Sequence, residues 1–308
     1  MNTIQIDPGL TEEQRRKQIY KGQIMVLSPT PGSLQLCAFA RELLVQGFGG
    51  LDPQKAHETL PVEKYAEILA VVKPKFIHHP ESKRLLRVIA AETGHDLANT
   101  YLDTPRLRSA APHDYLRFGI AYAFHPHRDT WYSAPFAQVN WWMPVYEFES
   151  GNSMAFHPRY WDKPVRNSSR NYNYQDWNEG PRQNAAAHIK SDTREQPKPE
   201  EEVEMEPQLR IVCPVGGIIL FSGAQLHSTV PNATGTTRFS IDFRSVNIED
   251  VRSGRGAHNI DSQCSGTAMV DYMRGLDMTP MPDELIIKHL APGYKEKTLG
   301  TQEKIKAT

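Results

Sequence analysis

The chain has 308 residues, enough for one large domain with additions or for two ordinary domains, and enough to bury a full-sized core. Its 35 Lys and Arg residues balance 36 Asp and Glu residues, so the formal net charge is −1 and neither nucleic acid nor an anionic membrane surface is an expected partner. No stretch reaches the roughly 18–20 apolar residues that a membrane-spanning helix needs, which predicts a soluble protein.

The N-terminus and the cysteines indicate the compartment. Residues 1–22 are charged and lack the apolar core of a secretory signal, so we expect none there. The chain has three widely spaced cysteines, Cys37, Cys213 and Cys264, which fit reduced thiols better than a disulfide framework. These features predict a cytoplasmic protein.

Residues 1–110 are predicted to form a mainly helical extension. Apolar residues recur at three- to four-residue spacing over residues 33–45, and similar patterns cover residues 62–72 and 81–92. Glycines follow the first and third patterns, as they often do where a helix ends.

Residues 111–248 are predicted to form a strand-rich core. Aromatic and β-branched residues dominate two blocks, 115–148 and 209–246, which proline and glycine break into short runs. Between the blocks, residues 160–207 form a long polar insertion that is either a lid over the site or a disordered spacer.

Residues 249–308 complete the chain with two further helix patterns, near 267–276 and 283–290, and a polar tail over 295–308 that we expect to be mobile. Helices, strands, an insertion, strands and closing helices indicate an α+β fold. We expect a double-stranded β-helix core (a jelly roll, cupin-like) with flanking N- and C-terminal helices, all within a single catalytic domain over residues 1–308.

A candidate metal site follows the first strand-rich run, in the sequence His-Pro-His-Arg-Asp. On an extended strand, side chains of the same parity share a face, so His127 and Asp129 can project toward one ion while Arg128 points away. His227, at the end of an apolar strand in the second block, supplies the third ligand. Two imidazoles and one carboxylate are typical of non-haem Fe(II) sites that keep positions open for a cosubstrate and dioxygen.

Two alternatives to this iron site stay open. His125 has the same parity as His127, and a pair of these histidines would favour a zinc-like arrangement, although His125 also suits a substrate contact or a buried hydrogen-bonding role. In the second alternative, the core is a non-catalytic binding module that keeps zinc or nickel.

A carboxylate-binding pair follows the distal histidine. Arg238 and Ser240 share one face of a strand, and a guanidinium and a hydroxyl that point into a pocket can hold a carboxylate. We therefore expect a dicarboxylic oxoacid as the cosubstrate, chelating iron at one end and contacting Arg238 at the other. Gln138 and Asn140 share a strand face and are expected to line this pocket, the alternative being two solvent-facing positions.

The candidate substrate contacts are His125, Trp131 and Arg244. Arg244 has the parity of Arg238, which suits it to an anionic group of the substrate, with a solvated arginine as the alternative. Trp131 is a candidate pocket wall, although aromatic residues this dense in a sheet more often belong to the core.

With these motifs the chain resembles the Fe(II)- and 2-oxoglutarate-dependent dioxygenases of the phytanoyl-CoA dioxygenase-like superfamily. His127-Arg-Asp129 is similar to the first metal motif of the family, His227 to its distal histidine, and Arg238-Phe-Ser240 to its cosubstrate motif. The resemblance covers the strand-rich core but not the insertion.

The resemblance implies that dioxygen splits 2-oxoglutarate into succinate and carbon dioxide while a C–H bond of a small-molecule substrate is oxidised. Hydroxylation is the default outcome, and desaturation or oxidative cyclisation uses the same cofactors. In halide-transferring relatives a small residue replaces the carboxylate, so Asp129 argues against halogenation. The sequence has no cluster of Lys and Arg for a coenzyme A phosphate, which favours a small polar metabolite, and it leaves the oligomeric state open.

Overall fold

A computed structural model describes residues 3–121, 125–182, 188, 191–290 and 294. The tail predicted to be mobile, residues 295–308, lies outside the described residues. The helices are α1 (Glu12–Ile19), α2 (Pro31–Gly47), α3 (Val62–His78), α4 (Pro80–Glu92), α5 (Tyr174–Glu179), α6 (Ile248–Ser253) and α7 (Asp283–Ile287). The strands are β1 (Ile4–Ile6), β2 (Ile24–Leu27), β3 (Thr100–Leu102), β4 (Arg106–Ala110), β5 (Val139–Pro144), β6 (Met154–Phe156), β7 (Leu209–Arg210), β8 (Ile218–Ser222), β9 (His227–Thr229), β10 (Arg238–Asn247) and β11 (Met273–Arg274).

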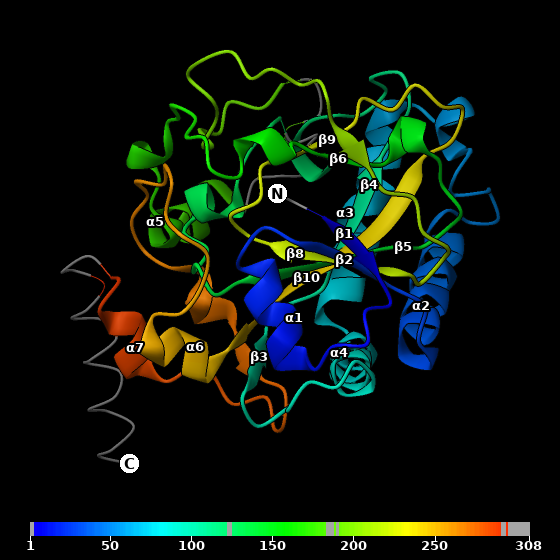
Figure 1. Cartoon of the computed structure of the whole chain (residues 1–308). Coiled ribbons are helices and arrows are strands. Elements are labelled where there is room, and N and C mark those ends of the chain that lie inside the picture. Colours follow the sequence, from blue (N-terminus) through cyan, green and yellow to red (C-terminus); the bar gives the residue numbers. More distant parts are fainter. Residues whose placement is uncertain (1–2, 122–124, 183–187, 189–190, 291–293, 295–308) are drawn as a thin grey trace.

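A large sheet occupies the centre of the fold (Figure 1). Its strand order is β1-β2-β8-β5-β10-β3-β11, and β4 also pairs with β10. Apart from the parallel pair β1–β2, its neighbouring strands run antiparallel. The ten-residue strand β10 pairs with β3, β4 and β5, so it joins the N-terminal part of the chain to the predicted core. The predicted combination of helices and strands is confirmed, and the large sheet is mostly antiparallel.

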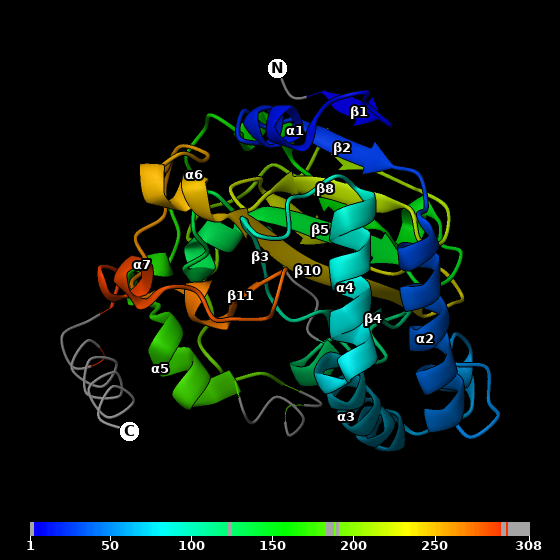
Figure 2. The same cartoon turned by 90° about the horizontal axis from the view of Figure 1, so that it is seen from below.

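The side chains of β10 alternate between the two faces of the sheet. Phe239, Ile241 and Phe243 are buried in the main hydrophobic cluster together with residues of α2, α3 and α4. These three helices cover that face (Figure 2). The intervening side chains of β10 are polar or charged and lie on the opposite face, which fixes the register of the strand because a one-residue slip would bury them in the helical layer.

A smaller sheet, β7-β6-β9, shares a second apolar cluster with the large one. Phe156 of β6 packs edge-on against Phe221 of β8, with ring centroids 4.9 Å apart, and Trp142 of β5 belongs to the same cluster. The polar face of β10 therefore lies on the side of the large sheet where the smaller sheet packs.

The helices predicted near residues 33–45 and 81–92 are confirmed as α2 and α4, and the one predicted at 62–72 continues as α3 to His78. Thr30 begins α2 with a capping box followed by Pro31, both typical of a helix start. The N-terminal residues are not only helical, however, because they also supply β1 to β4 to the large sheet.

Other parts of the chain depart from the sequence prediction. The helix predicted at 267–276 is wrong: Ala268–Asp271 forms a 3-10 helix and β11 follows. The Ala268 amide donates to the Ser133 carbonyl, and β11 pairs with β3, so these backbone groups do not form the hydrogen bonds of an α-helix. The polar insertion is partly packed, since Tyr172 and Tyr174 are buried. None of the helices in the described ranges combines the length and apolar character needed to cross a membrane.

Candidate metal centre

His127, Asp129 and His227 come together in a buried cluster. Each offers one ligand atom, and these three atoms lie within 4.8 Å of one another. The two histidines exchange backbone hydrogen bonds of 2.9 and 3.0 Å, and their ring centroids are 4.3 Å apart. The Asp129 Oδ1 atom lies 3.5 Å from His127 Nε2 and 3.8 Å from His227 Nε2. The cluster could hold one metal ion between the two imidazoles and the carboxylate.

The backbone reaches this arrangement by a turn where the sequence predicted a continuous strand. His127 lies in an isolated bridge to His227, and Asp129 begins the 3-10 helix Asp129–Tyr132. Ser133 ends that helix in the left-handed region, with φ 63°. The turn, rather than strand parity, therefore directs the Asp129 carboxylate toward the histidines.

Two backbone carbonyls fix the tautomers of the histidines. His127 Nδ1 lies 2.9 Å from the carbonyl oxygen of His125, and His227 Nδ1 lies 2.9 Å from that of Gln225. Because a carbonyl can only accept, Nδ1 carries the proton in each ring and the Nε2 lone pair faces the cluster. Burial, and then the neighbouring His127, lower the pKa of His227 to about 3, so its ring is neutral near pH 7.

The second oxygen of Asp129 is anchored by two amides. Gln138 Nε2 donates to Asp129 Oδ2 at 3.0 Å, and Asn140 Nδ2 donates to the same atom at 2.8 Å. Gln138 also donates to Asn140 Oδ1 at 2.7 Å and accepts from the Tyr272 hydroxyl at 2.7 Å. These bonds turn Oδ1 toward the histidines, a role that the sequence did not assign to Gln138 and Asn140.

The charge state of Asp129 suits a metal ligand. Burial by itself would raise its pKa, but contact with His127 and the charge of Arg244, followed by that of His227, outweigh burial and hold the pKa well below its ordinary value. The carboxylate is therefore ionised near neutral pH, as metal coordination requires.

Arg238 and Ser240 are buried polar side chains without hydrogen-bond partners at key atoms. Arg238 is 5 % exposed and Ser240 is 0 % exposed. Arg238 Nε and Nη1 and Ser240 Oγ find no partner among the described residues, and the guanidinium carbon lies 5.4 Å from the ring centroid of Trp142. Burial lowers the pKa of Arg238 to about 10, which leaves the side chain charged near neutral pH. A buried guanidinium whose N–H groups lack acceptors is suited to bind an anion.

Arg128 points away from the metal ligands, as the sequence predicted. Its Nε donates to Asp261 Oδ2 at 3.0 Å and its Nη1 donates to the Ala224 carbonyl at 2.6 Å. The indole of Trp131 donates to Asp261 Oδ1 at 2.7 Å, and the ring is wholly buried in a small apolar cluster. Trp131 therefore lies in the core beside the metal loop, the segment from His127 to Tyr132, and its only polar side-chain atom is bonded to Asp261.

His125 does not join the ligand cluster of the described residues. Its Nε2 lies 2.9 Å from the carbonyl oxygen of Pro197, and burial lowers its pKa to about 4. The hydroxyl of Tyr132 donates to the same carbonyl at 3.0 Å, while its ring lies 5.5 Å from His127 and 5.4 Å from Tyr172. The insertion therefore lies against the metal loop.

Arg244 lies beside the metal ligand Asp129. Its Nε is 3.8 Å from Asp129 Oδ2, and its Nη1 is 3.2 Å from Asp242 Oδ2. Asp242 in turn accepts from Arg108 Nε at 2.6 Å. The sequence did not predict that Arg108 lies near this site, because it belongs to a segment predicted to be helical. Charged and apolar residues alternate around it, which is typical of a strand.

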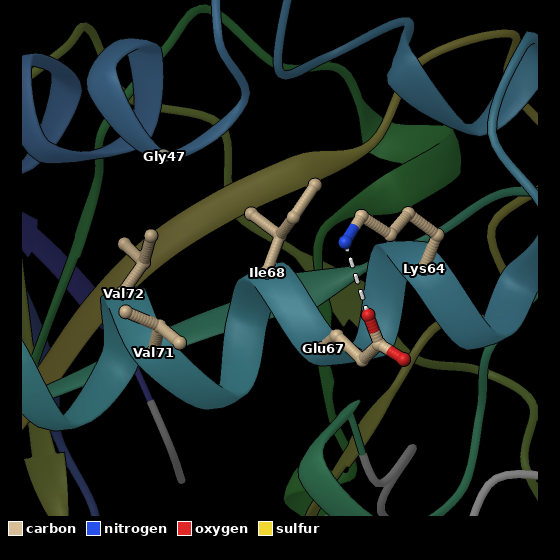
Figure 3. A pocket seen from close by; sticks show the side chains of 6 residues that line it. All are labelled: Gly47, Lys64, Glu67, Ile68, Val71 and Val72. Atoms are coloured by element: carbon tan, nitrogen blue, oxygen red, sulfur yellow. Dashed lines mark hydrogen bonds and ion pairs between the residues drawn. The ribbon is translucent and has the colours of Figure 1, made fainter.

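A surface depression of about 260 Å³ lies elsewhere, on α3 near the end of α2 (Figure 3). It contains an ion pair of 3.1 Å between Lys64 and Glu67. Its lining residues are Gly47, Lys64, Glu67, Ile68, Val71 and Val72. None of them belongs to the metal centre, so the depression has no part in the chemistry described above.

No protein-family model matches the chain, and no curated protein matches it. Among solved structures, EvdO2 from Micromonospora carbonacea var. aurantiaca, complexed with 2-oxoglutarate, is 15 % identical over 78 % of this chain and 92 % of that chain, with a TM-score of 0.42. SnoK, a non-heme alpha ketoglutarate dependent carbocyclase from nogalamycin biosynthesis, is 12 % identical over 82 % and 93 %, with a TM-score of 0.39. ThoJ, a non-heme monooxygenase, is 12 % identical over 71 % of each chain, with a TM-score of 0.35. Because these values are low, the activities of these proteins are not transferred to this chain on likeness alone.

Proposed function

We propose that this protein is a non-haem Fe(II)- and 2-oxoglutarate-dependent dioxygenase that oxidises a C–H bond of a small polar molecule. His127, Asp129 and His227 hold the metal, and Arg238 with Ser240 holds the far carboxylate of 2-oxoglutarate. We further propose that the two sheets together form a double-stranded β-helix, within a single catalytic domain of the phytanoyl-CoA dioxygenase-like superfamily.

The observation that carries the proposal is the unpaired, buried pair Arg238 and Ser240. A three-ligand cluster by itself also suits a module that binds zinc or nickel. Metal binding alone does not require a buried guanidinium and hydroxyl without partners. The second carboxylate of a dicarboxylic cosubstrate would accept the hydrogen bonds of both groups.

The donor set fits Fe(II), since two neutral imidazoles and one ionised carboxylate leave room for a chelating oxoacid and dioxygen. When bound, iron would activate dioxygen, the oxidant, which takes two electrons from 2-oxoglutarate as it becomes succinate and carbon dioxide and two from the C–H bond of the substrate. The carbonyls behind His127 and His227 orient the rings, and Gln138 and Asn140 hold Oδ2 of Asp129, which would leave Oδ1 to bind the metal.

The insertion is proposed to cover the substrate and limit the entry of water. Pro197 accepts hydrogen bonds through its carbonyl from Tyr132 and contacts His125, and both residues flank the metal loop. Tyr172, from the earlier part of the insertion, packs against Tyr132 on the same side. These contacts with residues next to the ligand cluster support the proposed covering role of the insertion.

The test is release of succinate from 2-oxoglutarate by protein loaded with Fe(II) without air and then exposed to dioxygen, alone and with a screen of small polar metabolites. Wild-type protein is expected to release succinate, and His127→Ala and Asp129→Ala to release none. His258→Ala, which changes an exposed histidine, is the matched control. Iron binding without any consumption of 2-oxoglutarate would favour the binding module. Analysis of the product separates hydroxylation from desaturation and ring closure.

A further inference from the structure

Asp261, in the C-terminal part of the chain, holds the loop that carries two of the metal ligands. Its Oδ2 atom accepts a hydrogen bond of 3.0 Å from Arg128 Nε, and its Oδ1 atom accepts one of 2.7 Å from the Trp131 indole. Arg128 lies between His127 and Asp129 in the sequence. One carboxylate therefore fixes the metal loop on both sides of Asp129.

The same carboxylate holds the beginning of the insertion. Its Oδ2 atom accepts a second hydrogen bond of 3.0 Å, from the backbone amide of Val165. The backbone carbonyl of Asp261 accepts a bond of 2.9 Å from Asn167 Nδ2, and the amide of Gln263 donates to Ser169 Oγ at 2.9 Å. Asp261 therefore connects the insertion with the metal loop, although the three segments are separated in the sequence.

Arg128, the partner of Asp261, bonds to two further segments. Its Nη1 donates to the Ala224 carbonyl at 2.6 Å, in the turn that precedes His227. Its Nη2 donates to the carbonyls of Tyr160 and Lys163, at 2.5 and 3.1 Å, where the insertion begins. The guanidinium therefore joins both segments that carry the metal ligands to the insertion.

The ion pair between Arg128 and Asp261 is closed to water. Their side chains are 1 % and 5 % exposed. A buried ion pair is stable only when hydrogen bonds satisfy its remaining donors and acceptors. Departure of residues 160–165 would take two acceptors from Arg128 and one donor from Asp261. The pair that positions the metal loop therefore depends on the docked insertion.

We infer that Asp261 is a positioning residue that couples the insertion to the metal loop, so that docking of residues 160–165 and binding of a metal by the ligand cluster stabilise each other. Asp261 lies outside the ligand cluster of the described residues, so it acts through the residues that it holds. Such coupling is reciprocal: each event changes the affinity of the other by the same factor. This inference rests on the proposed function, because it concerns the regulation of the same site.

The first test needs no variant. Hydrogen exchange over residues 160–169 is followed by mass spectrometry in the metal-free protein and in protein saturated with Ni(II). Coupling between two sites typically changes an affinity by roughly 5- to 150-fold, so exchange through local opening of this segment should slow about tenfold when Ni(II) binds. Exchange that Ni(II) binding leaves unchanged would overturn the inference, whether or not any variant folds.

Asp261→Asn removes the coupling with little change in side-chain volume. In either orientation, the new NH2 group faces a donor, because Trp131 donates to one oxygen of Asp261 and Arg128 and Val165 donate to the other. We expect Ni(II) to bind about tenfold more weakly, measured by competition with a chelator, and its effect on exchange over residues 160–169 to disappear. The visible absorption of bound Co(II), which depends on ligand geometry, should also differ from that of the wild type.

Asp250→Asn is the matched control, which separates positioning from a loss of stability. Asp250 is also a buried, ion-paired aspartate, with its side chain 4 % exposed. It accepts hydrogen bonds from Arg255 Nε at 2.7 Å and from the Tyr20 hydroxyl at 2.9 Å, and neither partner belongs to the metal loop or the insertion. Its loss should lower the free energy of unfolding but leave Ni(II) affinity, the Co(II) spectrum and the Ni(II) effect on exchange as in the wild type.

The outcomes distinguish this inference from the proposed function. If Asp261→Asn and Asp250→Asn have the same Ni(II) affinity and Co(II) spectrum, the inference is overturned while the metal site still stands. If Ni(II) does not bind the wild type, or binds His127→Ala equally well, the ligand assignment and with it the proposed function are overturned instead.

Discussion

Arg238→Met should change stability and cosubstrate binding in opposite directions. Two buried donors of Arg238 lack partners within the described part of the chain, and each unsatisfied donor costs roughly 1–3 kcal/mol. Trp142 and the charge of Asp242 offset part of this cost. We therefore expect the free energy of unfolding to rise by about 1 kcal/mol, which corresponds to an increase in Tm of roughly 2 °C at this chain length.

The same substitution removes the partner of the cosubstrate carboxylate. Breaking a buried ion pair on one side costs roughly 3–5 kcal/mol, so the dissociation constant of 2-oxoglutarate should rise about a hundredfold or more. Calorimetric titration with Ni(II)-loaded protein and urea unfolding of the metal-free protein measure the two effects. Arg128→Met is the matched control, because Arg128 is equally buried but makes four hydrogen bonds, and its loss should cost roughly 3–5 kcal/mol of stability.

Two results would refute this reasoning. If Arg238→Met destabilises the metal-free protein as much as Arg128→Met does, Arg238 has partners that the structure does not contain. If 2-oxoglutarate binds the Arg238→Met variant as tightly as the wild type, the far carboxylate is held elsewhere.

Three further predictions concern other parts of the molecule. Asn140→Ala removes an anchor of Asp129 and should weaken Ni(II) binding about tenfold to a hundredfold, measured by competition with a chelator. Burial, and then Arg15 and Arg16, lower the pKa of His95 from 6.5 to about 3. The stability that neutral His95 contributes is complete above pH 6.5 and declines as the pH falls toward 3, so His95→Gln should reduce the loss of unfolding free energy between roughly pH 7 and pH 5 by about 2 kcal/mol. Tyr132→Phe removes the hydrogen bond to Pro197 and should speed hydrogen exchange over residues 191–199 several-fold.

A control variant or a contrary result tests each of these predictions. Asn259→Ala changes an exposed asparagine far from the ligands in the sequence, and an equal loss of Ni(II) affinity there would contradict the role of Asn140. An unchanged pH dependence in His95→Gln would show that other groups cause the acid sensitivity. Tyr146→Phe removes a buried hydroxyl that has no partner among the residues that the structure describes, so exchange over the insertion should match that of the wild type.

The motif with two of the clustered ligand residues was predictable because it is local in the sequence, and the pair proposed to bind a carboxylate is local in the same way. His127 and Asp129 are two residues apart, and Arg238 and Ser240 lie on one strand, so parity suffices to associate them. The distal histidine was found because an apolar run precedes it, although that strand, β8, ends at Ser222 and His227 begins β9. The geometry that joins His127 to Asp129 was not predicted, since a 3-10 turn and a strand carry similar residues over so short a run.

The contacts that position the ligands escaped prediction because their partners are distant in the sequence. Asp261 holds Arg128 and Trp131 from 133 and 130 residues away, and Tyr272 reaches Gln138 across 134 residues. Nothing in the local sequence pattern links such pairs. Charged and apolar residues alternate in the strand that contains Arg106 and Arg108, which is typical of a strand. The segment was nevertheless predicted to be helical, because helix patterns precede it in the sequence.

The most direct test of the central claim is titration of 2-oxoglutarate into Fe(II)-loaded protein without air, for wild type and Asp129→Ala. The account predicts binding by the wild type that requires the metal, and loss of both metal and 2-oxoglutarate binding in Asp129→Ala. Equal binding of 2-oxoglutarate with and without Fe(II), or by both proteins, would contradict the assignment of His127, Asp129 and His227 as the centre that holds the metal and its cosubstrate.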